Sequence, residues 1–189
     1  MSREKLANII FPEITETIAD LEAKYPHRHL PKGAEVTRFA PSPTGFLHTG
    51  SLFAALVSKT IAHQSGGVFF VRLEDTDTKR EIEGAGETLL NEMRLFNVFP
   101  DEGYFGFKEE GKYGPYKQSE RASIYKTVIK QMIKDGLAYP CFCTTDDLTL
   151  LRATQEANKV VSGYYGPYAT CSTLSPEEAI AKIKAGIPY

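Results

Sequence analysis

Residues 36–73 constrain the fold more than any other part of this sequence. Residues 35–40 alternate like a short strand, and residues 51–64 carry apolar side chains at helical spacing until Gly66-Gly67 ends the helix. VFFVRL at 68–73 is an apolar run typical of a strand buried on both faces. A strand, a helix and a second strand in this order predict a βαβ unit. We therefore expect an α/β fold with a parallel sheet and a ligand site beyond the carboxyl ends of the strands.

The loop between the first strand and the helix has the composition of a phosphate site. It reads RFAPSPTGFLHTGS, residues 38–51, and places His48 and Gly50 where the helix begins. A helix N-terminus offers free backbone N–H groups and a positive dipole end, and a histidine there can donate a hydrogen bond to phosphate. The loop lacks the glycine-lysine pair of a Walker motif and the spacing of a dinucleotide fingerprint. A simple turn with a structural histidine is the alternative.

Charged residues of both signs follow the two predicted strands. Arg38 lies near the end of the first strand, and its planar guanidinium suits a carboxylate. Glu74 lies after the second strand and suits an ammonium group. Together they fit a small zwitterion such as an amino acid. The alternative is an Arg–Glu ion pair that only ties the strands together.

The rest of the chain alternates helices with loops. A loop rich in glycine and tyrosine runs through residue 116, and residues 139–143 resemble a short strand. Ser175 and Glu178 form a capping box that opens the last helix. Lys126, Lys130 and Lys134 form one stripe, which we interpret as a solvated face, with an RNA-backbone contact as the alternative. Helices are expected at residues 4–25 (one or two), about 82–97, 119–135, 145–158 and 176–185.

Three segments together resemble one family, the glutamyl-tRNA synthetases. They are RFAPSPTGFLHTGS, VRLEDTD at 71–77 and GPYKQSER at 114–121, and HTGS at 48–51 is similar to the family's form of the class I HIGH motif. Ser42-Pro43-Thr44 differs from the Glu-Pro-Asn of glutaminyl-tRNA synthetases, which favours glutamate. The resemblance runs from about residue 36 to the end.

The resemblance implies a two-step ligase reaction. Glutamate is activated with ATP, usually with Mg²⁺, to glutamyl-adenylate, and is then transferred to the 3′ end of tRNA(Glu). His48 and Gly50 would be catalytic. The binding residues that it implies are Arg38, Ser42 and Glu74 for glutamate, Ala40, His48 and Gly50 for ATP, and Asp77 for the tRNA acceptor end.

The resemblance also implies that the chain is an N-terminal portion of such an enzyme. Class I synthetases carry a second, KMSKS-like motif, and this sequence has none. We expect an N-terminal helical extension at residues 1–33, the first half of a Rossmann-like catalytic domain at 34–115, and the end of that half with part of an inserted α+β acceptor-binding domain at 116–189. The chain by itself is not expected to aminoacylate.

Cys141, Cys143 and Cys171 resemble a zinc site found in some members of the family. Zinc takes four ligands, and with no histidine nearby Tyr165 or Tyr168 would have to complete the set. Three ordinary thiols are the alternative.

Composition restricts the binding partners and the location that we expect for this protein. A net charge of −2 argues against wholesale binding of nucleic acid by charge alone, and three cysteines favour a reducing cytoplasmic location. The first thirty residues do not resemble a signal peptide, and the apolar runs are too short for a membrane span. We expect a monomeric cytoplasmic protein. The alternatives to a glutamyl-tRNA synthetase are a paralogue that glutamylates queuosine in tRNA(Asp), a small-molecule nucleotidyltransferase, and a non-catalytic RNA- or zinc-binding module.

Overall fold

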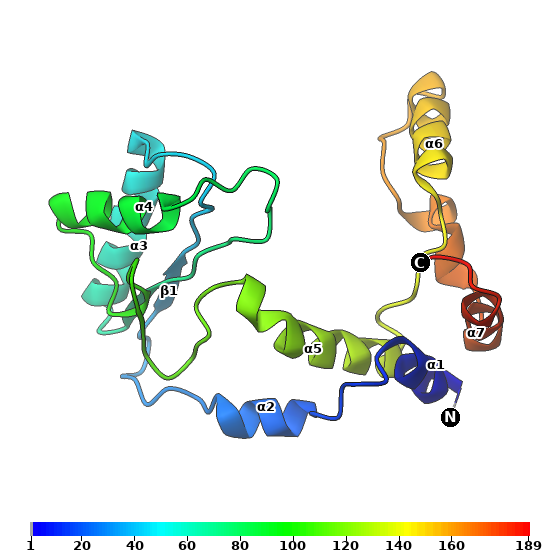
Figure 1. Cartoon of the computed structure of the whole chain (residues 1–189), viewed down its shortest axis with the longest axis horizontal. Coiled ribbons are helices and arrows are strands. Elements are labelled where there is room, and N and C mark those ends of the chain that lie inside the picture. Colours follow the sequence, from blue (N-terminus) through cyan, green and yellow to red (C-terminus); the bar gives the residue numbers. More distant parts are fainter. Residues whose placement is uncertain (1) are drawn as a thin grey trace. The chain divides into compact units, whose positions relative to one another are not determined.

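The computed structural model describes residues 2–189, which form two compact units (Figure 1). The sheet unit comprises residues 19–125, and the helical unit comprises residues up to 18 together with residues 126–189. The chain therefore passes between the units twice, within α2 (Ile18–Lys24) and within α5 (Ala122–Asp135). The division into domains at 1–33, 34–115 and 116–189 stays a prediction.

The sheet unit contains the predicted βαβ unit, so the α/β fold class is confirmed. Strand β1 (Val36–Phe39) pairs in parallel with β2 (Val68–Val71), and α3 (Thr49–Gln64) connects them and packs against both. After α4 (Ala85–Leu95), β3 (Glu102–Tyr104) adds to β2 in parallel, and β4 (Glu109–Glu110) closes the sheet antiparallel to β3. Phe69 and Val71 of β2 are fully buried in the core of this unit.

One segment of the sheet unit differs from the sequence-based expectation. The segment expected to be a loop contains β3 and β4, whose two or three residues are too short for a periodicity to register. The segment between α2 and β1 is attached to the sheet. Arg28 pairs with Glu102, and its guanidinium carbon lies 3.8 Å from the centre of the Tyr113 ring. The ring hydroxyl of Tyr113 donates to the Pro26 carbonyl at 2.9 Å.

The helical unit is built around an apolar cluster that includes the N-terminal helix. Figure 1 shows α1 (Ser2–Ile10) beside α7 (Pro176–Lys184), and their contact buries Leu6 and Ala7 against Ala179 and Ile180. Ile133 of α5 joins the same cluster. We therefore describe the N-terminal helix as part of this unit's core.

The remaining elements of the helical unit are α6 (Thr145–Ala157), the short 3₁₀ turns Gly166–Tyr168 and Thr170–Thr173, and α7. The capping box of Ser175 and Glu178 is confirmed, and Thr144 with Asp147 forms a second one at the start of α6. The strand expected at residues 139–143 is wrong. Pro140 has no N–H to donate, and the Phe142 N–H donates to the Cys171 sulfur at 3.3 Å instead of to a strand.

The interpretation of the lysine stripe as a solvated face is wrong for Lys130, whereas Lys126 is exposed as expected. Lys126 pairs with Glu13 at 2.8 Å. Lys130 is 8% exposed, and its ammonium group donates to the carbonyls of Phe11 and Ile14 at 2.9 and 2.7 Å. These lysines bind the segment that follows α1.

Within residues 2–189, no helix is long and apolar enough to cross a membrane.

Candidate functional site

A cavity opens where β1 ends and α3 begins. It is lined by the proline-rich loop and the first turn of α3, with Leu89 of α4 on one side. Three of the predicted site residues, Ala40, Ser42 and His48, lie in its wall. The structure therefore brings together, at one end of the parallel pair, residues that the sequence assigned to two different ligands.

His48 is the N-cap of α3, which begins at Thr49, slightly earlier than expected. Its Nδ1 accepts a hydrogen bond from the Ser51 N–H at 3.3 Å, so the ring hydrogen lies on Nε2. Nε2 in turn lies 2.8 Å from the Ser51 hydroxyl oxygen. An added Cβ at Gly50 would lie 3.2 Å from the imidazole ring, so Gly50 leaves room for the ring to fold over the helix start. The Nε2–H is therefore a donor that lies at the N-terminus of α3, next to the Ser51 hydroxyl.

Arg38 and Glu74 form an ion pair at the ends of the two parallel strands, outside the lining of this cavity. The Arg38 guanidinium lies 3.1 Å from the Glu74 carboxylate, and about a third of each side chain is exposed, 37% and 30%. The Glu74 N–H donates to the Pro41 carbonyl at 2.8 Å, which extends the pairing of the two strands past β2. An exposed ion pair contributes only about 0–1 kcal/mol to stability. It is therefore a weak tie between strands, while both charged groups stay accessible to a ligand.

The VRLEDTD and GPYKQSER segments meet at the same end of the sheet. The Leu73 N–H donates to the Tyr116 carbonyl at 2.9 Å, and the Gln118 N–H donates to the Leu73 carbonyl at 2.8 Å. The Asp75 carboxylate accepts from the N–H and the hydroxyl of Ser119 at 2.8 and 2.7 Å. Asp75 and Ser119 were not among the predicted site residues, because nothing in either segment alone shows that they pair.

Asp77 lies outside the lining of the cavity. Its carboxylate accepts a hydrogen bond from Arg80 at 2.6 Å, and both side chains are exposed. Gly50 also lies outside the lining, next to the His48 ring. The structure thus gathers most of the predicted residues at one strand end and leaves Asp77 on a neighbouring loop.

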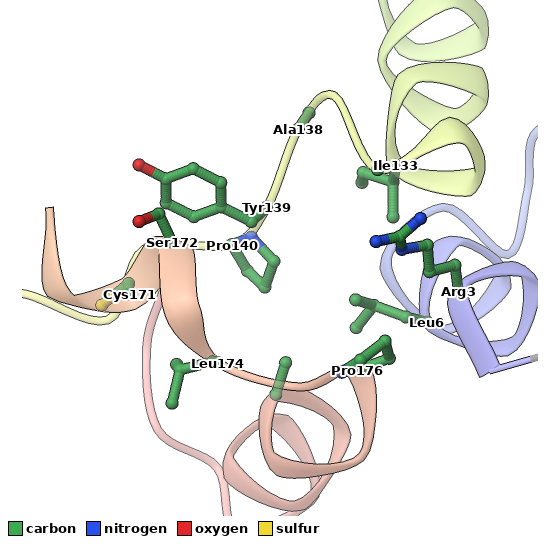
Figure 2. Close-up of a pocket in the computed structure, with 12 residues that line it drawn as sticks. Arg3, Leu6, Ile133, Ala138, Tyr139, Pro140, Cys171, Ser172, Leu174 and Pro176 are labelled. Atoms are coloured by element: carbon green, nitrogen blue, oxygen red, sulfur yellow. The ribbon is translucent and has the colours of Figure 1, made fainter. Parts of the chain in front are cut away.

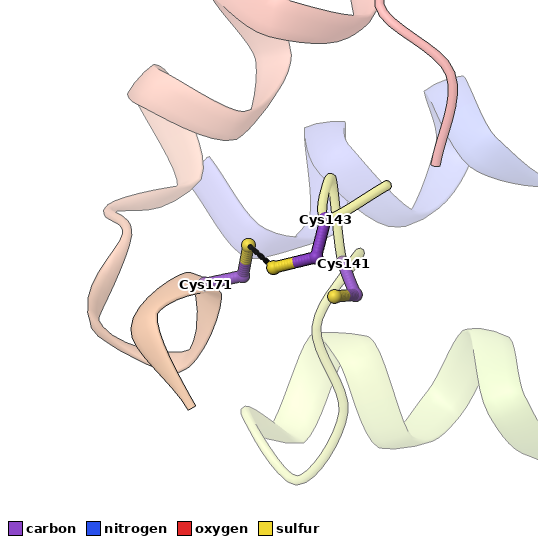
Figure 3. A group of neighbouring side chains, drawn as sticks. All are labelled: Cys141, Cys143 and Cys171. Carbon is purple, nitrogen blue, oxygen red and sulfur yellow. Dashed lines mark hydrogen bonds between the residues drawn. The ribbon is translucent and has the colours of Figure 1, made fainter. Parts of the chain in front are cut away.

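The three cysteines of the helical unit form a cluster (Figure 3). Their sulfur atoms all lie within 4.8 Å of one another, and those of Cys143 and Cys171 are 3.8 Å apart. The fourth member is Tyr164, whose hydroxyl oxygen lies 3.4 Å from the sulfurs of both Cys141 and Cys143. The same oxygen accepts from the Cys171 N–H at 3.1 Å.

Tyr164 corrects the expected choice between Tyr165 and Tyr168. Those two rings stack edge to face on each other with centroids 5.8 Å apart, and the Tyr165 hydroxyl donates to the Val161 carbonyl at 2.6 Å. Sequence could not separate three tyrosines within five positions. Only the backbone path of residues 158–171 determines which of them faces the sulfurs.

Protonation in the cluster favours metal binding by Cys171. Burial raises the pKa of this thiol, but hydrogen bonds from the Tyr164 hydroxyl, the Phe142 N–H and the neighbouring thiols outweigh burial and lower its pKa to about 7. Burial, followed by the hydrogen bonds to the cysteines, raises the pKa of Tyr164 above that of a free phenol. Three thiols and one oxygen around a common centre suit a tetrahedral zinc site.

A second cavity, in the helical unit, has a different character (Figure 2). Leu6 of α1, Ile133 of α5 and Pro176 of α7 surround it, with Arg3 at one side. Most of its lining residues have apolar side chains, and none is an aspartate or a glutamate. It is a gap beside the apolar cluster, and its lining offers no pair of opposite charges.

Comparison with known proteins gives a consistent result. The family described as tRNA synthetases class I (E and Q), catalytic domain, matches residues 35–189. The chain is 52% identical over 190 residues to a glutamate–tRNA ligase of Clostridium perfringens strain 13, covering 100% of this chain and 35% of that protein. It is 49% identical to a glutamate–tRNA ligase of Acetivibrio thermocellus, covering 94% of this chain and 33% of that protein.

Solved structures agree with these sequence relatives. A glutamate tRNA ligase from Elizabethkingia meningosepticum, in complex with its amino acid, superposes with a TM-score of 0.71 at 37% identity, covering 83% of this chain and 31% of that chain. The enzyme from Elizabethkingia anophelis superposes with a TM-score of 0.72 at 36% identity. The chain spans about a third of the length of the curated relatives that it matches.

Proposed function

The chain belongs to the class I tRNA synthetases for glutamate and glutamine, and we propose that it is the N-terminal part of a glutamate–tRNA ligase. The observation that carries this proposal is that His48, at the start of α3, and the Arg38–Glu74 ion pair both lie at the carboxyl end of one parallel strand pair. A donor at a helix N-terminus suits a phosphate, and an accessible pair of opposite charges suits an amino acid.

In the proposed mechanism, the site holds glutamate and ATP side by side. Arg38 binds the side-chain carboxylate of glutamate, and Glu74 with Ser42 binds its amino group. Ala40 and Gly50 line the ATP site. One oxygen of the α-carboxylate of glutamate attacks the α-phosphorus of ATP, the bond to the β-phosphate breaks, and pyrophosphate leaves. The His48 Nε2–H donates to a phosphate oxygen as negative charge builds up there.

The second step transfers glutamate to tRNA. A hydroxyl of the terminal adenosine attacks the carbonyl carbon of glutamyl-adenylate, and AMP leaves as the new ester bond forms. Asp77, on its exposed loop, is the residue that we assign to the acceptor end of tRNA(Glu).

Mg²⁺ would arrive with the phosphates of ATP, since within residues 2–189 a cluster of three or more potential metal ligands occurs only at the cysteines. A monomeric, cytoplasmic enzyme is part of the same proposal.

The test of this function is glutamate-dependent ATP–pyrophosphate exchange by the full-length protein, with and without tRNA, beside the 189-residue chain. We expect exchange that requires both glutamate and tRNA in the full-length protein, and no exchange by the shorter chain. Exchange that does not need tRNA would favour the queuosine-directed paralogue. Exchange that does not need glutamate would favour a nucleotidyltransferase, and a complete lack of exchange would favour a binding module.

We also propose that the cysteine cluster holds structural zinc. Cys141, Cys143, Cys171 and the Tyr164 oxygen would supply all four ligands, which leaves no position for a substrate and so gives the metal no catalytic part. Zinc there would fix the segment around Cys141 to the turn at Cys171, two parts of the helical unit that no strand pairing joins.

For this site, we expect wild-type protein to retain about one zinc ion per chain and Cys143→Ser to lose it. Tyr164→Phe should weaken zinc binding measurably, whereas Tyr165→Phe, one position along, should not, because its hydroxyl bonds to the Val161 carbonyl. Metal content by mass spectrometry, before and after dialysis against a chelator, measures both. Wild-type protein without zinc after growth in zinc-supplemented medium would contradict the proposal.

A further inference from the structure

Arg72 lies at the carboxyl end of β2, two residues before Glu74. Its backbone N–H donates to the Phe39 carbonyl at 3.1 Å, so the parallel ladder that pairs Arg38 with Phe70 continues through Arg72. Paired residues of parallel strands point to the same face, and so do residues two apart. Arg38, Arg72 and Glu74 therefore share one face of the sheet, at the end where the candidate site lies.

The Arg72 side chain lacks a hydrogen-bond partner at Nε and an ion-pair partner of its own within residues 2–189. Its Nε atom is buried and finds no hydrogen-bond partner anywhere in residues 2–189. Over the same residues no carboxylate forms an ion pair with its guanidinium, and the Glu74 carboxylate is bound by Arg38. A buried donor without a partner costs roughly 1–3 kcal/mol, and more when the group is charged. A bound anion would remove this cost.

The charges around Arg72 strengthen the case for an anion. Burial, and next to it the positive charge of Arg38, lowers the pKa of Arg72, and Arg121 acts in the same direction while Glu74 opposes it. The Arg121 guanidinium already has a hydrogen-bond partner, because it donates to the Pro115 carbonyl at 2.7 Å. Arg38 and Arg72 are thus two neighbouring cations with one shared carboxylate. An arginine always keeps its charge, so the imbalance persists until a ligand arrives.

We propose that Arg72 is a second binding residue for the side-chain carboxylate of the substrate, acting beside Arg38. Two guanidinium groups would then recognise one carboxylate, and the ligand would supply the missing counter-charge. The inference rests on the proposed function, because it takes glutamate as the substrate. A γ-amide carries no charge, so the same arrangement would disfavour glutamine.

The test is the kinetics of Arg72→Gln in the full-length protein, by ATP–pyrophosphate exchange with tRNA present. We expect the KM for glutamate to rise roughly 10- to 100-fold, as for the loss of a charge-assisted hydrogen bond. The KM for ATP and the inhibition constant of glutamine should each stay within about twofold. A role confined to structure would not separate a charged ligand from its neutral analogue. Arg72→Lys keeps the charge without the planar fork, and we expect a smaller rise, roughly 3- to 10-fold.

Arg28→Gln is the matched control, since Arg28 has a partner in Glu102 outside the site. It should lower thermal stability and leave the KM for glutamate unchanged. An unchanged KM for glutamate in Arg72→Gln, or an equal rise in the KM for ATP, would overturn the proposal, the second outcome pointing to a phosphate ligand. If Arg72→Gln does not fold, an unchanged KM in Arg72→Lys has the same meaning. Wild-type protein without glutamate-dependent exchange would instead overturn the proposed function.

Discussion

Replacing His48 by alanine is expected to lower the rate of glutamate-dependent ATP–pyrophosphate exchange by about 10²-fold or more. The imidazole Nε2–H is the side-chain donor at the start of α3, 2.8 Å from the Ser51 hydroxyl. In the proposed transition state a phosphate oxygen gains negative charge close to this donor. Removing the donor should affect the rate more than the binding of ATP, because the interaction is strongest when the charge is greatest.

The same substitution also removes the N-cap of α3, which costs about 1 kcal/mol of stability. His48→Asn separates the two effects, because asparagine is a good N-cap without an imidazole. We expect His48→Asn to restore the melting temperature and not the rate. His63→Ala is the control at the other end of α3, where His63 bonds to Asp101. A stable His48→Ala enzyme with the wild-type exchange rate would refute the assigned role.

The sequence predicts the parts of the site that are local in the chain. The helix that follows the proline-rich loop fixes His48 at a helix N-terminus, and the strand pattern fixes Arg38 and Glu74 at strand ends. The bond from His48 to Ser51 spans only three residues, yet it depends on a rotamer that the pattern does not specify. The link from Asp75 to Ser119 spans 44 residues and leaves no local signal.

Tertiary contacts explain where the sequence-based fold was wrong. Lys130 sits in a regular lysine stripe, and the stripe predicts a solvated face. The segment after α1 folds over it and supplies the carbonyls of Phe11 and Ile14 as acceptors. The strand expected around Cys141 has suitable residues, but the Phe142 N–H donates to the sulfur of Cys171, in a 3₁₀ turn, rather than to another strand. Propensity sets what a segment can form, and the partner decides what it does form.

Gly67 also has a role that the sequence does not reveal. The pattern indicates only that the pair Gly66-Gly67 ends a helix. Gly66-Gly67 predicts the end of α3, and Gly66 does end it, with a φ of 73° that suits glycine. Gly67 is needed for a different reason. A Cβ added there would lie 1.8 Å from the Glu35 carbonyl oxygen and 2.8 Å from the Glu35 nitrogen. The Val68 N–H donates to that carbonyl at 3.1 Å, immediately before the first paired residues of β1 and β2.

Gly67→Ala is therefore expected to lower the free energy of unfolding of the sheet unit by roughly 3 kcal/mol or more. The added methyl group meets backbone atoms, which cannot rotate away as a side chain can. Gly66→Ala is the neighbouring control. Its nearest contact would be a Pro31 side-chain atom at 3.7 Å, so it should cost only the roughly 1–2 kcal/mol of a left-handed alanine. Urea unfolding followed by circular dichroism measures both, and equal costs would contradict the argument.

The position of Gly67 extends this prediction to the site. The pairing of Val36 with Val68 begins the register that brings the end of β1 next to the end of β2. Because of that register, a guanidinium nitrogen of Arg38 lies 3.1 Å from a carboxylate oxygen of Glu74. If Gly67→Ala folds at all, it must push the strands apart at their start, and the KM for glutamate should rise with it. Gly66→Ala leaves the strand pairing intact, so a similar rise in that variant would show that the register does not position the charged pair.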